Sequence, residues 1–117
     1  MDDCLVYIGA GEQGGARGRL RVDVAWLGAA ADGVGRLVGH ATGTEWAVER
    51  LRSPEGWRVT WRKGERVVAW AAFYYASGPL EGQPEFFFAD LLAEMLSLVR
   101  VMLGPLAGQE ERPDEQK

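Results

Sequence analysis

A glycine-rich segment near the N-terminus has the one spacing in this chain that is typical of a cofactor site. Residues 9 to 14 are Gly-Ala-Gly-Glu-Gln-Gly, which matches the dinucleotide-binding pattern G-x-G-x-x-G and follows an apolar run. In that chemistry the amide groups at the start of a helix bind the pyrophosphate. Here residues 19–26 have the two-residue period of a strand instead. The context favours a flexible loop over residues 9–18, and a phosphate-binding glycine loop at residues 9–15 is kept as an alternative.

The residues most often used in catalysis and metal binding are scarce. His40 is the single histidine and Cys4 the single cysteine, so spacing defines neither a metal site nor a catalytic triad. The acidic neighbours Asp2 and Asp3 disfavour a thiolate at Cys4, and with it a reactive nucleophile. Carboxylates near the C-terminus suit a solvated face rather than acid–base chemistry: Glu81, Glu85, Asp90 and Glu94. We therefore predict no catalytic, metal-binding or cofactor-binding residue.

Aromatic and basic side chains interleave between residues 57 and 66. Single-stranded nucleic acid is bound by this combination, through stacking on the rings and neutralisation of the phosphates. In a strand, however, alternation sends Trp57 and Trp61 to one face and Arg58 and Arg62 to the other, which separates the two ingredients. A basic sheet face stays possible, and its candidate residues are Arg19, Arg21, Arg58 and Arg62.

Charge is distributed unevenly along the chain. The formal net charge is -4, yet residues 15–66 carry ten basic and six acidic side chains, a net of +4. The remainder carries three basic and eleven acidic side chains, a net of -8. The middle of the chain could therefore present a basic surface, while the acidic remainder would repel a polyanion unless it lies elsewhere in the fold. We expect no nucleic-acid binding at physiological salt.

Two segments have more apolar residues than one small core requires. Residues 67–76 are apolar or aromatic without a break, and in the helical pattern over residues 84–103 the polar stripe is narrow. Large apolar patches are rarely left exposed to water, so we expect a second copy or another protein to cover them. The predicted interface residues are Phe73, Tyr75, Phe87, Leu91, Met95, Leu98 and Met102.

The first half of the chain is predicted to contain mainly strands. Residues 4–8 and 19–26 have strand patterns, and in the second of these Leu20, Val22, Val24 and Trp26 share one face. Gly28 to Gly35 is predicted as a loop, followed by a weaker strand over residues 36–42. For residues 44–52 a capping box at Thr42 and Glu45 would suit a helix. We prefer a strand, because Ser53-Pro54-Glu55-Gly56 fits a type I turn that joins two strands.

A second hairpin is predicted around Lys63-Gly64. With this two-residue turn, Trp57 is opposite Trp70, Val59 opposite Val68, and Trp61 opposite Arg66. That register collects aromatic and aliphatic side chains on one face. It predicts that Trp57 and Trp70 are cross-strand neighbours in the core.

A long helix is predicted to follow. Pro84 suits its first turn, acidic residues lie near its positive end, and Gly104-Pro105 is a stop signal. Residues 107–117 form a charged tail that we predict to be disordered, which leaves residues 1–106 as a single domain.

The fold predicted from these elements is α+β, with a mainly antiparallel, meander-like sheet of five to six strands and one long C-terminal helix packed on it. No apolar stretch reaches the length of a membrane span, and the acidic N-terminus does not resemble a signal peptide, so we expect a cytoplasmic protein. Eleven arginines against two lysines, with no asparagine, are typical of a GC-rich genome, bacterial or phage.

The predicted function is a small non-enzymatic protein that acts through protein–protein contact, as an accessory, inhibitor or immunity-type factor, and forms a homodimer. The second hypothesis is a nucleic-acid-binding module that uses the arginine-rich sheet face. The third is an enzyme that uses the glycine loop.

Overall fold

The computed structural model describes residues 3–11, 13–75 and 85–111. Within them the chain forms β1 (Asp3–Ala10), β2 (Gln13–Arg21), a short 3-10 helix (Val24–Trp26), α1 (Leu27–Thr42), β3 (Glu45–Arg52), β4 (Glu55–Lys63), β5 (Arg66–Tyr74), β6 (Glu85–Phe86) and α2 (Phe88–Glu111). The strands make one sheet in the order β3-β4-β5-β1-β2-β6. Neighbours are antiparallel except β2 and β6, so the predicted α+β fold with a mainly antiparallel sheet is confirmed.

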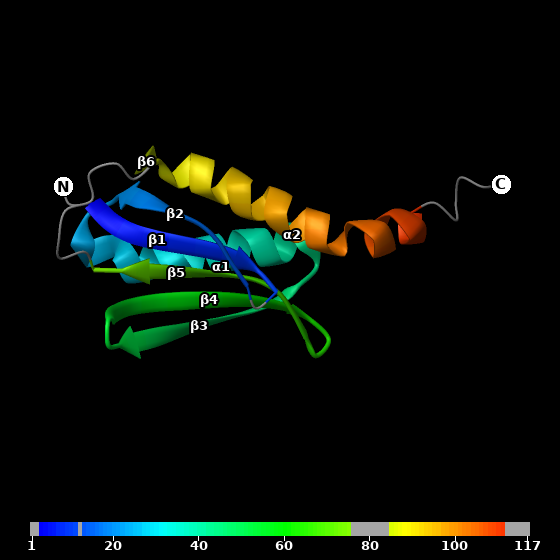
Figure 1. The fold of residues 1–117 in the computed structure, drawn as a ribbon, viewed down its shortest axis with the longest axis horizontal. Coiled ribbons are helices and arrows are strands. Elements are labelled where there is room, and N and C mark those ends of the chain that lie inside the picture. The colour runs from blue at the N-terminus through cyan, green and yellow to red at the C-terminus, as the bar shows by residue number, and fades with distance from the viewer. Residues whose placement is uncertain (1–2, 12, 76–84, 112–117) are drawn as a thin grey trace.

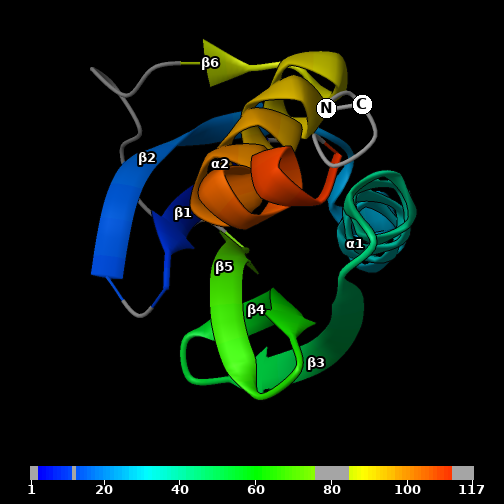
Figure 2. The same ribbon diagram turned by 90° about the vertical axis from the view of Figure 1, so that its right-hand side faces the viewer.

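Both helices lie on the same face of the sheet (Figures 1 and 2). α1 packs on β3 and β4, and α2 packs on β5, β1, β2 and β6. The two helices also contact each other, and both begin at the end of the sheet where β6 lies (Figure 1). The sheet therefore has a covered face, which carries the helices, and an open face without a helical layer.

The helix α1 was not predicted. Residues 24–42 were expected to continue one strand, form a loop and start another, whereas the structure places the 3-10 helix and α1 there. Leu27, Ala31, Val34 and Val38 recur at helical spacing and are all buried. The glycines between them weaken this pattern, because each glycine in a helix is about 1 kcal/mol less favourable than alanine.

The glycines of α1 allow the helix to lie very close to the sheet. A Cβ atom at Gly28 would be 2.9 Å from the Trp57 ring, and one at Gly35 would be 2.9 Å from Val59 Cγ1. The indole N–H of Trp61 donates a hydrogen bond of 3.1 Å to the carbonyl oxygen of Gly35. Larger side chains on this side of α1 would push the helix away and break that contact.

The predicted register of the β4–β5 hairpin is wrong by three residues. Val59 lies opposite Ala71 instead of Val68, and Trp57 lies opposite Phe73 instead of Trp70. The turn is formed by Gly64 and Glu65, with Gly64 at a φ of 66°, and the pairing is irregular between Trp61 and Arg62. Because three is odd, Trp70 faces the side of the sheet opposite to Trp57.

The other strand predictions are confirmed in part. The preferred strand over residues 44–52 is confirmed as β3, and its hairpin turn centres on Ser53 and Pro54, because Arg52 pairs with Glu55. The glycine-rich segment 9–18 is not a long loop. Most of it belongs to β1 and β2, which meet in a tight turn.

The C-terminal helix differs from its prediction at both ends. Its start is preceded by β6, and the helix continues through Gly104-Pro105 to Glu111. Asp90 lies in the first turn, as predicted, and its Oδ2 accepts a hydrogen bond of 3.4 Å from the Phe87 amide. One face of α2 is buried in the core: Leu91, Met95, Val99 and Leu103. Pro84 and residues 112–117 lie outside the described residues.

Candidate interaction surfaces

The predicted glycine loop is a β-hairpin. Gly9 pairs with Gly14, and the turn residue Gly11 has a φ of 60°. The element that follows is strand β2, so the helix N-terminus that a phosphate-binding loop needs is not there. A hairpin with small residues explains the glycine spacing without a cofactor.

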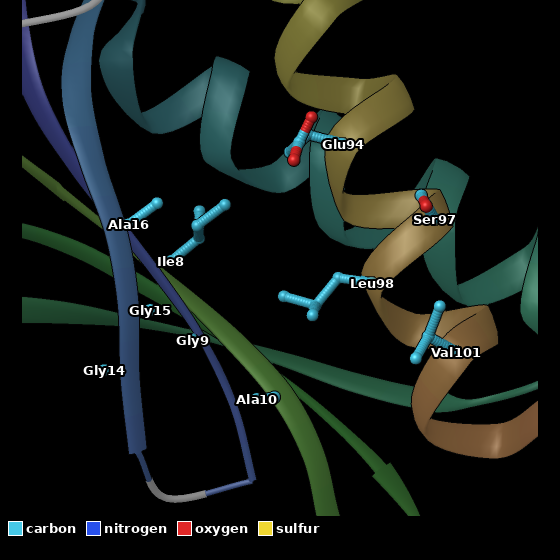
Figure 3. Close-up of a pocket in the computed structure, with 10 residues that line it drawn as sticks. All are labelled: Ile8, Gly9, Ala10, Gly14, Gly15, Ala16, Glu94, Ser97, Leu98 and Val101. Atoms are coloured by element: carbon cyan, nitrogen blue, oxygen red, sulfur yellow. The ribbon is translucent and has the colours of Figure 1, made fainter.

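This hairpin borders a groove on the helix side of the sheet (Figure 3). The groove has a volume of about 300 Å³ and lies between the hairpin and α2. Its strand side is small and apolar, whereas α2 contributes Glu94, Ser97, Leu98 and Val101. The carboxylate of Glu94 would repel a phosphate, so the groove suits an apolar group better than an anion.

No arrangement typical of catalysis or metal binding is found among the described residues. His40 is exposed, and its ring contacts Trp46 with the ring centroids 5.0 Å apart. Cys4 is fully buried, which keeps its thiol from solvent and substrates. Asp90 and Glu94 are exposed on α2. Within residues 3–11, 13–75 and 85–111, no group of three or more His, Cys, Asp or Glu side chains could hold a metal ion.

In β4 the tryptophans and the arginines lie on opposite faces of the sheet, as the alternation of the segment predicts. Trp61 is fully buried under α1, and Trp57 lies beside it on the same face, partly buried. The indole N–H of Trp57 donates a hydrogen bond of 3.0 Å to the Tyr75 hydroxyl. Neither ring is therefore available to the arginines of the other face.

The open face nevertheless has aromatic residues of its own. Trp70 and Tyr74 lie on β5 and Tyr7 on β1, the two central strands of the sheet, and all three are partly buried. The rings of Tyr7 and Tyr74 meet edge to face, with their centroids 5.7 Å apart. The guanidinium of Arg58 lies over the Trp70 ring, 5.1 Å from its centroid. Sequence analysis missed this aromatic group because the register that defines it was wrong.

Arginines flank these rings on both sides. By strand register β2 contributes three and β4 two to the open face: Arg17, Arg19, Arg21, Arg58 and Arg62. All four predicted basic-face residues are among them. Three acidic residues of this face lie on the outer strands, Glu45, Glu49 and Glu85, and a fourth, Asp3, is in register with Arg21 at the start of β1. Glu85 pairs with Arg21 at 2.8 Å and with Arg19 at 4.0 Å.

The outer surface of the helical layer has a different character. Four large apolar side chains are exposed there: Trp26 by 63%, Phe87 by 58% and Phe88 by 37% at the starts of the helices, and Leu37 by 46% in the second half of α1. Gly33 and Leu37 share one side of α1 by helical spacing, and Trp26, the last residue of the 3-10 helix, directly precedes α1. A Cβ atom on Gly33 would be 3.7 Å from the tip of the Phe88 ring, so Phe88 lies against that same side. We call Trp26, Leu37, Phe87 and Phe88 the helix-layer patch.

The predicted interface residues are divided between the core and this patch. Phe73, Leu91 and Met95 are fully buried within the chain, which removes them as surface contacts. Tyr75, Leu98 and Met102 are partly buried against the core, and Phe87 belongs to the patch. Trp26 and Leu37 were missed because α1 was not predicted as a helix.

Among the described residues, neither helix is long and apolar enough to cross a bilayer. Comparisons of the chain with protein-family models, curated proteins and solved structures find no match. Any functional conclusion therefore depends on the two surfaces of the molecule, namely the helix-layer patch and the open sheet face.

Proposed function

We propose that this protein acts without catalysis, through protein–protein contact, and forms a homodimer through the outer surface of its helical layer. The observation that supports this proposal is the helix-layer patch, in which four large apolar side chains are 37% to 63% exposed. Single exposed apolar residues are ordinary, but a group of them in one region is typical of a protein contact. Trp and Phe are also residue types that are enriched at interfaces.

A second copy of the chain fits the charges around this patch. The exposed charged side chains of the two helices have both signs: Asp32, Arg36, Asp90, Glu94 and Arg100. Two copies can approach through such a surface without strong repulsion, and a two-fold interface needs one patch that is complementary to itself. The open sheet face has five arginines against four acidic residues, and the arginines lie next to the central rings, so two copies that met there would bring like charges together.

The first prediction concerns assembly. Light scattering at micromolar concentration should give about twice the chain mass of 12.8 kDa. Leu37→Arg or Trp26→Arg should give a monomer, because each places a charge in the centre of an apolar contact. Both side chains are largely exposed, so these variants should keep the melting temperature of the monomeric fold.

Val101→Arg is the matched control. Val101 is 67% exposed, but it lies toward the far end of α2, beside the groove. We expect this variant to remain dimeric. A wild-type chain that is monomeric over the whole concentration range would contradict the homodimer. A dimer that only Val101→Arg disrupts would instead place the contact at the groove.

A further inference from the structure

We infer that the open face of the sheet binds single-stranded nucleic acid. The two ingredients of such sites, rings for stacking and cations for phosphates, are both present on this face. The rings of Tyr7, Trp70 and Tyr74 occupy the central strands β1 and β5. The arginines occupy the adjacent strands β2 and β4, one on each side.

The dimensions of the face suit a short run of nucleotides. Strands β4, β5, β1 and β2 are consecutive in the sheet, so three interstrand spacings of about 4.8 Å separate the arginines of β4 from those of β2, roughly 14 Å in all. Bases stacked on the central rings would leave their phosphates toward these flanking rows. At roughly 14 Å this face is wider than the major groove of a duplex, which is about 12 Å, and this favours a single strand.

Trp70 is the residue most directly prepared for stacking. Its ring is held between the strands, with the guanidinium of Arg58 over its face at 5.1 Å. Its indole N–H has no hydrogen-bond partner among the residues that the structure describes. A base can take the place of the guanidinium over the ring, and Arg58 then turns toward a phosphate.

The acidic groups are arranged so that they permit this binding. Asp90 and Glu94 belong to α2, on the other side of the sheet. Three acidic residues of the open face lie on β3 and β6, the outermost strands. The central strands have one on this face, Asp3, which is in register with Arg21 at the end of β1 farthest from Trp70. An acidic peptide would use the arginines but not the rings, so the rings favour nucleic acid.

The experiment is a titration of a fluorescent oligothymidylate of about 12 nucleotides, followed by anisotropy. With three phosphate contacts, affinity should fall about twentyfold between about 50 and 200 mM salt, because each contact releases counterions from the strand. Arg17→Glu combined with Arg58→Glu should weaken binding at least about tenfold. Trp70→Leu keeps an apolar residue in the strand and should weaken binding about tenfold, since it removes a stacking surface.

Arg36→Glu is the control for a charge reversal away from the open face: it reverses one exposed arginine of α1, which is half the charge change of the double variant. It should leave affinity within about twofold, apart from the general effect of net charge. Absence of binding at low salt would overturn the inference, and so would an equal loss with Arg36→Glu. Binding that Trp70→Leu leaves intact and poly-glutamate displaces would also overturn it, and would identify an acidic protein as the ligand.

Discussion

The two faces of the sheet use the same kinds of residue for opposite purposes. On the covered face Trp61 is fully buried, and α1 lies so close that Gly35 accepts its indole N–H. On the open face Trp70 is only partly buried, is covered by an arginine, and finds no acceptor for its N–H within residues 3–11, 13–75 and 85–111. An aromatic residue therefore indicates core or binding surface only after its face is known.

The comparison explains the apolar run at residues 67–76. In β5, Ala69, Ala71 and Phe73 face the helices, while Trp70, Ala72 and Tyr74 face the open side. A strand at the centre of the sheet can be apolar on both sides when one side meets a core and the other meets a ligand. The helix α2 is not apolar on both sides in this way, because its exposed positions include Glu94, Ser97 and Arg100.

The largest difference in stability between the two faces is expected when a tryptophan on each face is replaced by alanine. Trp61→Ala should lower the free energy of unfolding by about 3–5 kcal/mol, because it leaves a large cavity under α1. Trp70→Ala should lower it by only about 1–2 kcal/mol, because part of that ring already reaches water. Urea denaturation measures both. Equal losses would show that the open face contributes to stability as the core does.

Smaller changes in stability are expected when glycines of α1 are replaced by alanine, and the sign should differ between two positions of this helix. Gly35→Ala would press a methyl group against Val59 and should destabilise by about 1–3 kcal/mol. Gly33→Ala meets only the Phe88 ring, at an ordinary distance of 3.7 Å, and should stabilise by about 0.5–1 kcal/mol through helix propensity. Thermal unfolding of the two variants gives the signs. Two losses of the same size would contradict close packing at Gly35.

The smallest change in stability is expected when the arginine that covers Trp70 is replaced. Arg58→Ala removes an exposed cation–π contact and should change stability by no more than about 1 kcal/mol. Arg50 lies over the Trp57 ring at the same 5.1 Å and also pairs with Glu55 at 2.7 Å, so Arg50→Ala is the comparison on the other face. If Arg58→Ala lowered the free energy of unfolding by several kcal/mol, this arginine would have a structural role in the fold.

Much of the fold follows from local patterns in the sequence. Alternation identified β4, the turn signal at residues 53–56 identified β3, and the run of apolar residues at helical spacing identified α2. The helix α1 was missed because Gly28, Gly33, Gly35 and Gly39 are poor helix formers, and their role in close packing depends on tryptophans far along the chain. Helix propensity describes an isolated helix, whereas α1 forms because of its tertiary contacts with the sheet.

The open face could not be derived because it depends on register. A turn at Gly64-Glu65 and an irregular pair at Trp61 and Arg62 shift β5 by three residues relative to the alternation-based prediction. Each of these features is too small to leave a clear pattern, yet together they move Trp70 to the other face. The four arginines proposed for a basic face do lie on the open face, because their placement depends on β2 and β4 alone.

The pairing of β1 with β5 determines when the open face is completed during synthesis and folding of the chain. These two strands join a hairpin made by the first residues to a three-stranded unit completed only at Tyr74. Tyr7 and Tyr74 meet across that seam, 67 positions apart in the chain. The aromatic group therefore belongs to neither part alone. A fragment that ends before β5, or a chain still being synthesised up to that point, has the arginines of β2 and β4 but no ring from β5 between them.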